Sequence, residues 1–205
     1  DNKKPLGAWK HLTSSPIPIG KVSDEFTKAE KVGIVCGKVS GTWDSPRKVK
    51  ISGLEVIDID TKHDKAKDID DRLISAIEAE SPTLLKKLTI QSTISGGRHL
   101  IYKCPQIGGN AKLAKNADGG TIIETRGEGG YLVAAPSDGY KVLFGNLRKI
   151  ATISIEEREL LHRICKGFDE TGQAPKRQRQ ANAPKVSALN RTILGLKRFY
   201  ACEAL

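Results

Sequence analysis

Six short runs rich in valine and isoleucine limit the fold of this chain more than any other feature of its sequence. β-Branched residues favour the pleated strand, and short runs of them between glycine, serine or proline are typical of sheet strands. The glycine-rich residues 127–130 predict a hairpin that joins the last two runs. We therefore predict strands at residues 32–37, 54–60, 89–93, 99–104, 121–127 and 131–137.

Helical periodicity interrupts this series between the second and third predicted strands. Apolar residues recur there at helical spacing from Ile69 to Leu88, and Pro82 divides the pattern, so we expect one or two helices. A further helix is predicted after Ser154, because Ser154 and Glu157 form a capping box before an apolar helical face. The periodicity alone therefore indicates a mixed α and β fold.

The composition is that of a globular protein, with 28% charged and 38% hydrophobic residues among 205. It excludes a wholly disordered or collagen-like chain.

No stretch approaches the roughly 20 apolar residues needed to span a bilayer, and the start lacks the apolar core of a signal peptide. The four cysteines form no CxxC pair, so neither a disulfide framework nor a structural zinc is predicted. We expect a soluble intracellular protein with no membrane partner.

The composition changes near residue 170. We predict a main domain at residues 1–170, a basic linker at 171–186 and the start of a truncated C-terminal helical region at 187–205, because proline, glutamine and asparagine without an apolar period are typical of linkers. The formal net charge is +10. Basic tails are either solvated or bind phosphate backbones. The candidates for nucleic-acid contacts in the linker are Lys176, Arg177 and Arg179.

Asp58 and Asp60 alternate with isoleucines in the predicted strand 54–60. Both carboxylates therefore project from one face of the strand, with their Cα atoms about 7 Å apart at roughly 3.3 Å per residue. Two carboxylates this close repel each other unless a cation bridges them, and hard oxygen ligands suit Mg²⁺ or Mn²⁺. The pair is either a metal site or two solvated acids at the end of a strand.

Two further motifs carry groups that could act with these acids. In residues 95–99, two glycines allow close backbone approach to an anion, and Arg98 and His99 add donors for phosphate oxygens; the alternative is a tight hairpin turn with a packed histidine. Glu124 lies in an apolar strand, where an isolated carboxylate is costly to bury. Its partner is either Arg126, as a structural ion pair, or a metal shared with Asp58 and Asp60.

The ordered set LEVIDID, STISGGRHLIY and IIETRGEGGYLVAAPS, preceded by KKPLGAWK and VGIVCGKVSG, resembles the primase-polymerase (Prim-Pol) domain of the archaeo-eukaryotic primase superfamily. The closest likeness is to the domains of plasmid, phage and prophage replication proteins, and it spans roughly residues 4–168. The resemblance implies an α+β fold, the archaeo-eukaryotic primase catalytic core, in which a modified RRM-like antiparallel sheet packs with a smaller α/β unit.

The resemblance also implies an activity, namely template-dependent nucleotidyl transfer by a DNA primase/polymerase with two Mg²⁺ or Mn²⁺ ions. Its implied partners are a single-stranded DNA template, NTP or dNTP substrates and a helicase beyond residue 205. The implied setting is replication of a mobile element, phage or plasmid in a bacterial, archaeal or phage-infected cytoplasm. The implied catalytic metal ligands are Asp58, Asp60 and Glu124, although many relatives carry aspartate at the third position. The implied nucleotide-binding residues are Ser95, Gly97, Arg98, His99 and Arg126.

Two other classes of function stay open. A metal-dependent nuclease or nicking replication initiator uses similar residues, but a nicking enzyme needs a catalytic tyrosine near a His-hydrophobe-His pair, and His99 is followed by Leu100 and Ile101. A non-catalytic RRM-like nucleic-acid-binding module needs exposed aromatic side chains on adjacent strands. Only Tyr102 and Tyr131 could form such a pair, and this reading leaves the three acids unexplained.

Overall fold

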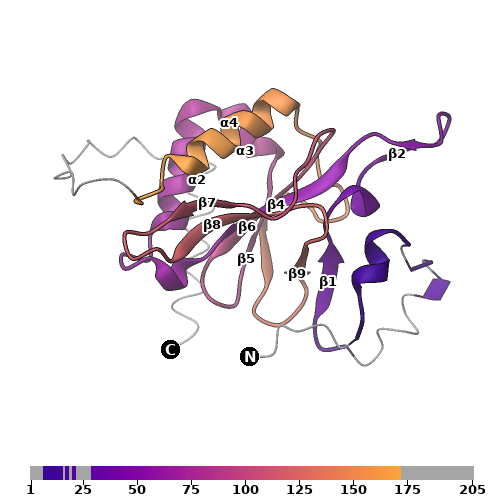
Figure 1. Cartoon of the computed structure of the whole chain (residues 1–205), viewed down its shortest axis with the longest axis horizontal. Coiled ribbons are helices and arrows are strands. Elements are labelled where there is room, and N and C mark those ends of the chain that lie inside the picture. The colour runs from indigo at the N-terminus through magenta and orange to yellow at the C-terminus, as the bar shows by residue number, and fades with distance from the viewer. Residues whose placement is uncertain (1–6, 16, 19, 22–28, 172–205) are drawn as a thin grey trace.

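The computed structural model describes residues 7–15, 17–18, 20–21 and 29–171, and within them a six-stranded antiparallel sheet forms the centre of the molecule (Figure 1). The strand order is β10-β5-β6-β4-β8-β7, so β4 lies in the middle. These strands are β4 (Gly53–Ile59), β5 (Thr89–Ser92), β6 (Arg98–Cys104), β7 (Lys112–Lys115), β8 (Thr121–Arg126) and β10 (Lys141–Phe144).

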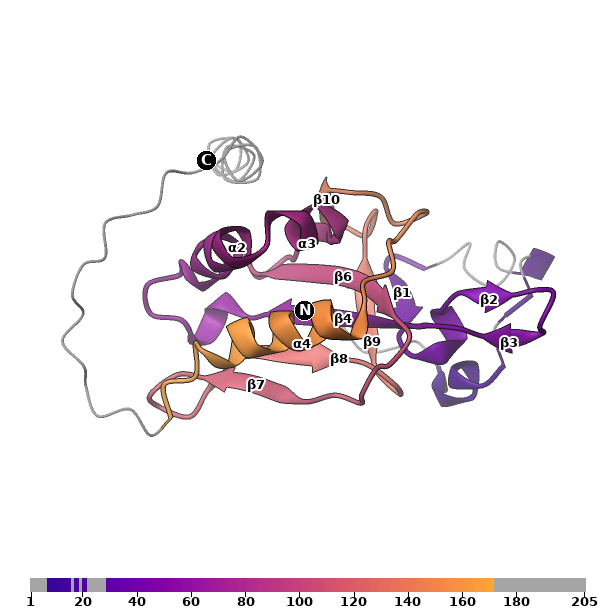
Figure 2. The ribbon, with the colours of Figure 1, turned by 90° about the horizontal axis from the view of Figure 1, so that it is seen from above.

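Helices cover one face of this sheet (Figure 2). In the described part of the chain they are α2 (Ile69–Glu80), α3 (Pro82–Lys87) and α4 (Ile155–Lys166). Ile57 and Ile59 of β4 are buried against them in the larger hydrophobic core. Each buried isoleucine contributes about 1.5 to 3 kcal/mol, so the alternating pattern of β4 fixes which of its faces meets the helices.

A second, smaller layer lies against the other face. Strands β1 (Val32–Val35) and β9 (Tyr131–Ala134) pair antiparallel in a separate two-stranded sheet. Leu132 of β9 packs with Val56 of β4 in the smaller hydrophobic core. Strands β2 (Trp43–Asp44) and β3 (Val49–Lys50) form a hairpin that projects beyond the sheet (Figures 1 and 2). The 3₁₀ turns are η1 (Lys10–Thr13), η2 (Lys38–Ser40) and η3 (Thr61–His63).

The structure confirms the predicted α+β class and each predicted strand, and Pro82 divides the helical segment in two. The capping box of Ser154 and Glu157 is also present. The predicted hairpin between strands 121–127 and 131–137 is wrong. Both edges of β8 are already paired, to β4 and to β7, so the chain turns at residues 127–130 and crosses to the second layer, where β9 pairs with β1.

Several other expectations concern residues that are only partly described. The predicted linker and C-terminal helical region lie outside the described residues except for Thr171, and so do Lys176, Arg177 and Arg179. None of the helices in the described part is both long and apolar enough to cross a membrane. The described cysteines are buried and free of disulfides: Cys36, Cys104 and Cys165.

A buried carboxylate ties α4 to the sheet. The side chain of Glu55, on the helix-covered face of β4, is fully buried and accepts hydrogen bonds from Arg158 Nε and Nη2 at 2.5 and 2.9 Å and from the Tyr102 hydroxyl at 2.6 Å. His162 Nε2 lies 3.4 Å away. Burial by itself would raise the pKa of Glu55, but its hydrogen bonds to Arg158, His162 and Tyr102 outweigh burial and lower the pKa from 4.5 to about 2.

We expect Glu55→Gln to lower the free energy of unfolding at neutral pH by about 3 kcal/mol, because it leaves Arg158 without its buried counter-charge. A carboxylate with a lowered native pKa stabilises the fold above its unfolded pKa and loses this contribution as pH falls. The wild type should therefore lose stability between pH 4.5 and about 2, and the variant should lose less over that interval. Urea unfolding at several pH values measures both effects.

The exposed Glu159 on the same helix provides the control, because Glu159→Gln makes the same chemical change outside the buried network. Its stability should match that of the wild type at every pH. Equal acid sensitivity of the Glu55→Gln variant and the wild type would refute the anchoring role of Glu55.

Candidate active site

The register of the central sheet places five polar side chains in one row. Asp58 on β4 is paired with His99 on β6 and with Glu124 on β8. The row continues from His99 to Gln91 on β5 and from Glu124 to Lys112 on β7. Directly paired residues of adjacent strands lie on the same face of a sheet. Residues far apart in the sequence therefore meet on the face opposite the large helices.

The middle three residues of this row, Asp58, His99 and Glu124, line a pocket of about 200 Å³ between the two layers. Tyr140, directly before β10 of the same sheet, lines the pocket beside these residues, and Tyr131 of β9 lines it from the other layer. The pocket is therefore a cleft with acids, a histidine and Tyr140 on the side of the central sheet and Tyr131 on the other.

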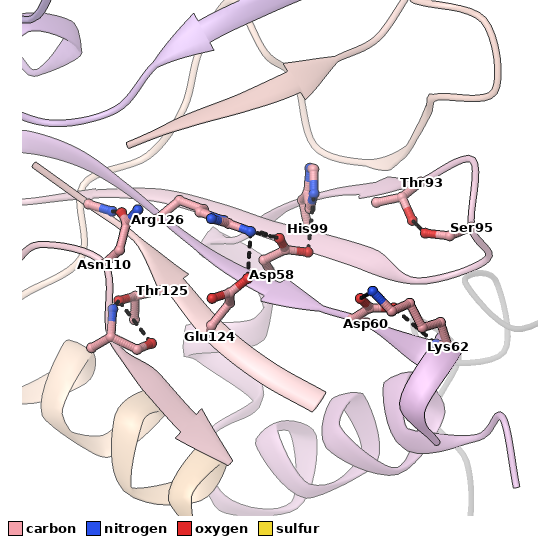
Figure 3. Close-up of polar contacts among 12 residues, drawn as sticks. Asp58, Asp60, Lys62, Thr93, Ser95, His99, Asn110, Glu124, Thr125 and Arg126 are labelled. Carbon is pink, nitrogen blue, oxygen red and sulfur yellow. Dashed lines mark hydrogen bonds and ion pairs between the residues drawn. The ribbon is translucent and has the colours of Figure 1, made fainter. Parts of the chain in front are cut away.

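Asp58 is the centre of the charged contacts in the pocket (Figure 3). Arg126 donates to Asp58 Oδ2 from Nη2 at 3.2 Å and from Nε at 3.3 Å, and His99 Nε2 lies 3.4 Å from Oδ1. Burial by itself would raise the pKa of Asp58. The hydrogen bond and electrostatic attraction of His99 and the positive charge of Arg126 outweigh burial, so the pKa of Asp58 lies below its usual value.

Glu124 shares the guanidinium of Arg126 with Asp58. Arg126 Nη2 lies 2.5 Å from Glu124 Oε1 and 3.2 Å from Asp58 Oδ2, so these two carboxylate oxygens are within about 6 Å of each other. Desolvation raises the pKa of Glu124, and the negative charge of Asp58 adds to the rise against the opposing effect of Arg126. The structure thus contains the ion pair with Arg126 that was one of the two alternatives for Glu124.

Asp60 lies at the end of the same strand and also lines the pocket, but its carboxylate has other partners. It accepts a hydrogen bond from the backbone N–H of Lys62 at 2.9 Å and lies 3.8 Å from Lys62 Nζ, as Figure 3 shows. Asp60 therefore begins the 3₁₀ turn η3 as its N-cap. Of the three predicted acids, the structure brings Asp58 and Glu124 together and holds Asp60 to one side.

Residues 93–97 form the turn between β5 and β6, which was the simpler of the two interpretations of this segment. Ser95 lines the pocket, and its carbonyl oxygen accepts a hydrogen bond from the Thr61 hydroxyl at 3.1 Å. A Cβ at Gly97 would lie 2.0 Å from the Ile59 carbonyl oxygen, so only glycine lets the turn pack against β4. Gly97 holds the turn in place and does not line the pocket.

Arg98 does not reach the pocket either. It is 2% exposed on the helix-covered face, with Nε 2.9 Å from Asp70 and Nη2 2.7 Å from Asp71 at the start of α2. Its Nη1 has no hydrogen-bond partner among the described residues. Adjacent residues of a strand point to opposite faces, so Arg98 and His99 could not both face the pocket once β6 begins at Arg98. We leave Arg98 out of the site.

Gln91 lies outside the motifs that the sequence marks, but it controls the orientation of His99. Gln91 is fully buried, its Nε2 donates to the Val133 carbonyl at 2.8 Å, and its Oε1 accepts from the Ala135 N–H at 3.1 Å. These backbone contacts fix the orientation of the amide. Nε2 then also faces His99 Nδ1 at 2.8 Å, which makes Nδ1 the acceptor and leaves the ring proton on Nε2, toward Asp58.

The chemistry of Asp58 and Glu124 fits a divalent cation, since both are carboxylates and hard cations prefer oxygen ligands. Within the described residues, no group of three histidine, cysteine, aspartate or glutamate side chains is arranged to hold a metal. Arg126 supplies the positive charge between the two acids. The structure therefore provides two suitable ligands side by side, with Asp60 turned toward Lys62.

A comparison of the chain with known protein families gives a match. A family model described as Prim-Pol, bifunctional DNA primase/polymerase, N-terminal, matches residues 1–154. The matched range includes Asp58, His99 and Glu124 and stops directly before α4. No curated protein matches the chain.

We expect Arg98→Ala to lower the free energy of unfolding by about 3 to 5 kcal/mol, because it leaves the fully buried Asp70 without its counter-charge. Arg163→Ala on α4 is the control. Arg163 pairs with Glu80 at the surface, where ion pairs contribute at most about 1 kcal/mol. Equal unfolding midpoints for the two variants in urea would show that Arg98 is not the anchor of α2.

We expect the neutral His99 ring to carry its proton on Nε2 in the wild type and to lose this preference in Gln91→Leu. The ¹⁵N chemical shifts of the two ring nitrogens measure the tautomer directly and are not changed by a simple loss of stability. Gln106→Leu makes the same substitution at an exposed position and should keep the wild-type shifts. A protonated Nδ1 in the wild type would contradict the role given to Gln91.

Proposed function

The chain belongs to the bifunctional DNA primase/polymerase (Prim-Pol) family, and we propose that it catalyses template-dependent nucleotidyl transfer at the row centred on Asp58. A primase/polymerase-type function, with DNA and nucleotides as substrates, follows from the family. One observation carries the assignment to this row: the register brings the family's acid, histidine and acid motifs to one pocket.

The donors for an incoming nucleotide line the same pocket. His99 presents Nε2, Ser95 its hydroxyl group and Arg126 a guanidinium, and each of these groups can donate a hydrogen bond to a phosphate oxygen. Charge-assisted hydrogen bonds of this kind are the strong ones. We propose that these three residues bind the triphosphate, and that Gln91 keeps the proton of His99 directed into the pocket.

We propose Asp58, Asp60 and Glu124 as ligands of two Mg²⁺ or Mn²⁺ ions. Bound there, such ions would lower the pKa of a primer 3′-hydroxyl and neutralise the charge of the leaving pyrophosphate. The chain's own part is positioning, which dominates in phosphoryl transfer. The rigid central strand holds Asp58, and the adjacent strands hold the groups that bind the phosphates.

Single-stranded DNA is the proposed template, and NTPs or dNTPs are the proposed substrates. We expect extension of an existing primer more than primer synthesis from this chain, because in relatives a helical domain after the linker assists priming. A helicase beyond residue 205 and a role in the replication of a mobile element, phage or plasmid are further proposals from the family resemblance.

The non-catalytic RRM-like alternative loses one of its two aromatic candidates. Tyr102 is fully buried beneath α4 and donates its hydroxyl hydrogen to Glu55, so its ring cannot stack on a base. Tyr131 lines the pocket, and Tyr102 does not.

The nuclease alternative differs in its product, because a nuclease shortens a labelled strand and a polymerase lengthens it.

The test is the incorporation of labelled nucleotide on a primed template with Mg²⁺ or Mn²⁺. We expect Asp58→Ala to reduce incorporation by about a hundredfold or more, and a chelator to abolish it until Mg²⁺ or Mn²⁺ is restored.

His99→Ala should reduce nucleotide use by roughly one to two orders of magnitude, since it removes a charge-assisted hydrogen bond worth about 1.5 to 3 kcal/mol. Its template affinity without nucleotide should stay the same.

Matched substitutions outside the pocket are the controls. Asp118→Ala removes an exposed carboxylate, and His11→Ala an exposed imidazole; both variants should incorporate nucleotide at the wild-type rate. Shortening of the labelled strand, or template binding with no incorporation by the wild type, would overturn the proposed function. A His99→Ala variant with poor DNA binding and normal nucleotide use would move His99 from the nucleotide site to the template path.

A further inference from the structure

The hairpin of β2 and β3 stands away from both layers of the domain (Figures 1 and 2). Within the described residues, its two strands pair only with each other. Residues 45–51, its turn and second strand, are exposed. The hydrophobic cores of the domain include none of its side chains. Packing of the fold therefore does not explain the composition of this hairpin.

The hairpin combines an exposed indole with basic side chains. Trp43 is 52% exposed, the highest value for a large hydrophobic residue in the described part of the chain. It is paired across the hairpin with Lys50, and directly paired residues lie on the same face. Arg47 and Lys48 are exposed in the turn between the strands. Asp44 is the one acid in residues 43–50, and it contacts Arg47 at 3.7 Å.

We propose that this hairpin binds single-stranded nucleic acid, with Trp43 stacked on a base and Lys48 and Lys50 on neighbouring phosphates. Aromatic platforms beside basic groups are how proteins bind single strands without sequence preference. Lysine is depleted in protein–protein interfaces, so the pairing of Trp43 with Lys50 favours a phosphate backbone over a protein partner. The inference rests on the proposed function, because the strand it would hold is the template.

The position of the hairpin suits a strand that also reaches the pocket. β3 leads directly into β4, and Asp58 lies near the far end of β4. Asp58 lies five residue positions after Gly53, which is about 17 Å at roughly 3.3 Å per residue. A strand of several nucleotides could therefore contact the hairpin while its end lies at the pocket.

The test is the affinity of the full chain for a fluorescein-labelled oligothymidylate of about 20 nucleotides, without nucleotide or divalent cation. Trp43→Ala should raise Kd by about tenfold, and Trp43→Phe should recover much of the loss because phenylalanine can also stack. The pair Lys48→Ala and Lys50→Ala should reduce the salt dependence of log Kd by about 1.4, roughly 0.7 for each lost phosphate contact. Val142→Ala, at another exposed apolar side chain, should bind as the wild type does.

Tryptophan fluorescence gives a second, direct readout. The chain has two tryptophans, so Trp9→Phe leaves Trp43 as the reporter, and stacking should quench its emission as the oligothymidylate binds. Unchanged emission together with wild-type affinity in Trp43→Ala would overturn the proposal. Self-association of the chain that Trp43→Ala abolishes, with oligonucleotide affinity unchanged, would overturn it in favour of a protein contact.

Oligothymidylate binding and nucleotide incorporation test the hairpin surface and the polymerase activity separately. Oligothymidylate binding that depends on Trp43, without any incorporation of nucleotide, would support the hairpin surface and refute polymerase activity. Normal primer extension with unchanged oligothymidylate affinity in Trp43→Ala would refute the hairpin surface and leave the active site as proposed.

Discussion

The antiparallel register of β4 between β6 and β8 is the constraint on which the site depends. It pairs Asp58 with His99 on one side and with Glu124 on the other. A slip of one residue in either pairing would turn a whole set of side chains to the opposite face. Ile57 and Ile59 oppose such a slip, because they are buried under the helices and would lose that burial. The packing that stabilises the sheet therefore also holds the polar row of the Prim-Pol site in place.

Strand β4 carries two acids on opposite faces, the fully buried Glu55 and the half-buried Asp58, and their surroundings give them different roles. Glu55 faces the helices, where Arg158 and Tyr102 enclose it completely. Asp58 faces a pocket, and its partners Arg126 and His99 line that pocket with it. Positive groups lower the pKa of both carboxylates against the cost of burial. Glu55 can only anchor α4, whereas Asp58 remains accessible to a ligand that brings its own charge.

The second layer makes a site out of what would otherwise be an exposed sheet face. β9 supplies the pocket wall through Tyr131, and its Val133 carbonyl fixes the amide of Gln91, which in turn orients His99. This coupling explains why β9 has to leave β8 and cross to β1. A hairpin of β8 and β9 would need the edge of β8 that β7 occupies, and it would leave the polar row uncovered.

The sequence by itself determined the large helices, six of the ten strands of the described residues, the face of β4 that carries Asp58, and the family; it did not predict β2, β3, β7 and β10. These predictions follow from patterns only a few residues long, such as the alternation in β4 and the capping box at Ser154, because backbone periodicity acts locally. The predicted strand begins at residue 99, whereas β6 begins at Arg98. Because neighbouring residues of a strand point to opposite faces, a strand beginning at Arg98 would have placed Arg98 and His99 on different faces from the sequence alone. Only the tertiary structure decided that Gln91 holds His99, that Arg126 lies between Asp58 and Glu124, and that Asp60 turns toward Lys62. The first two contacts join residues of different strands and depend on register, which no local pattern encodes. The third is local, but whether Asp60 turns to Lys62 or to the pocket depends on which neighbours compete for its charge.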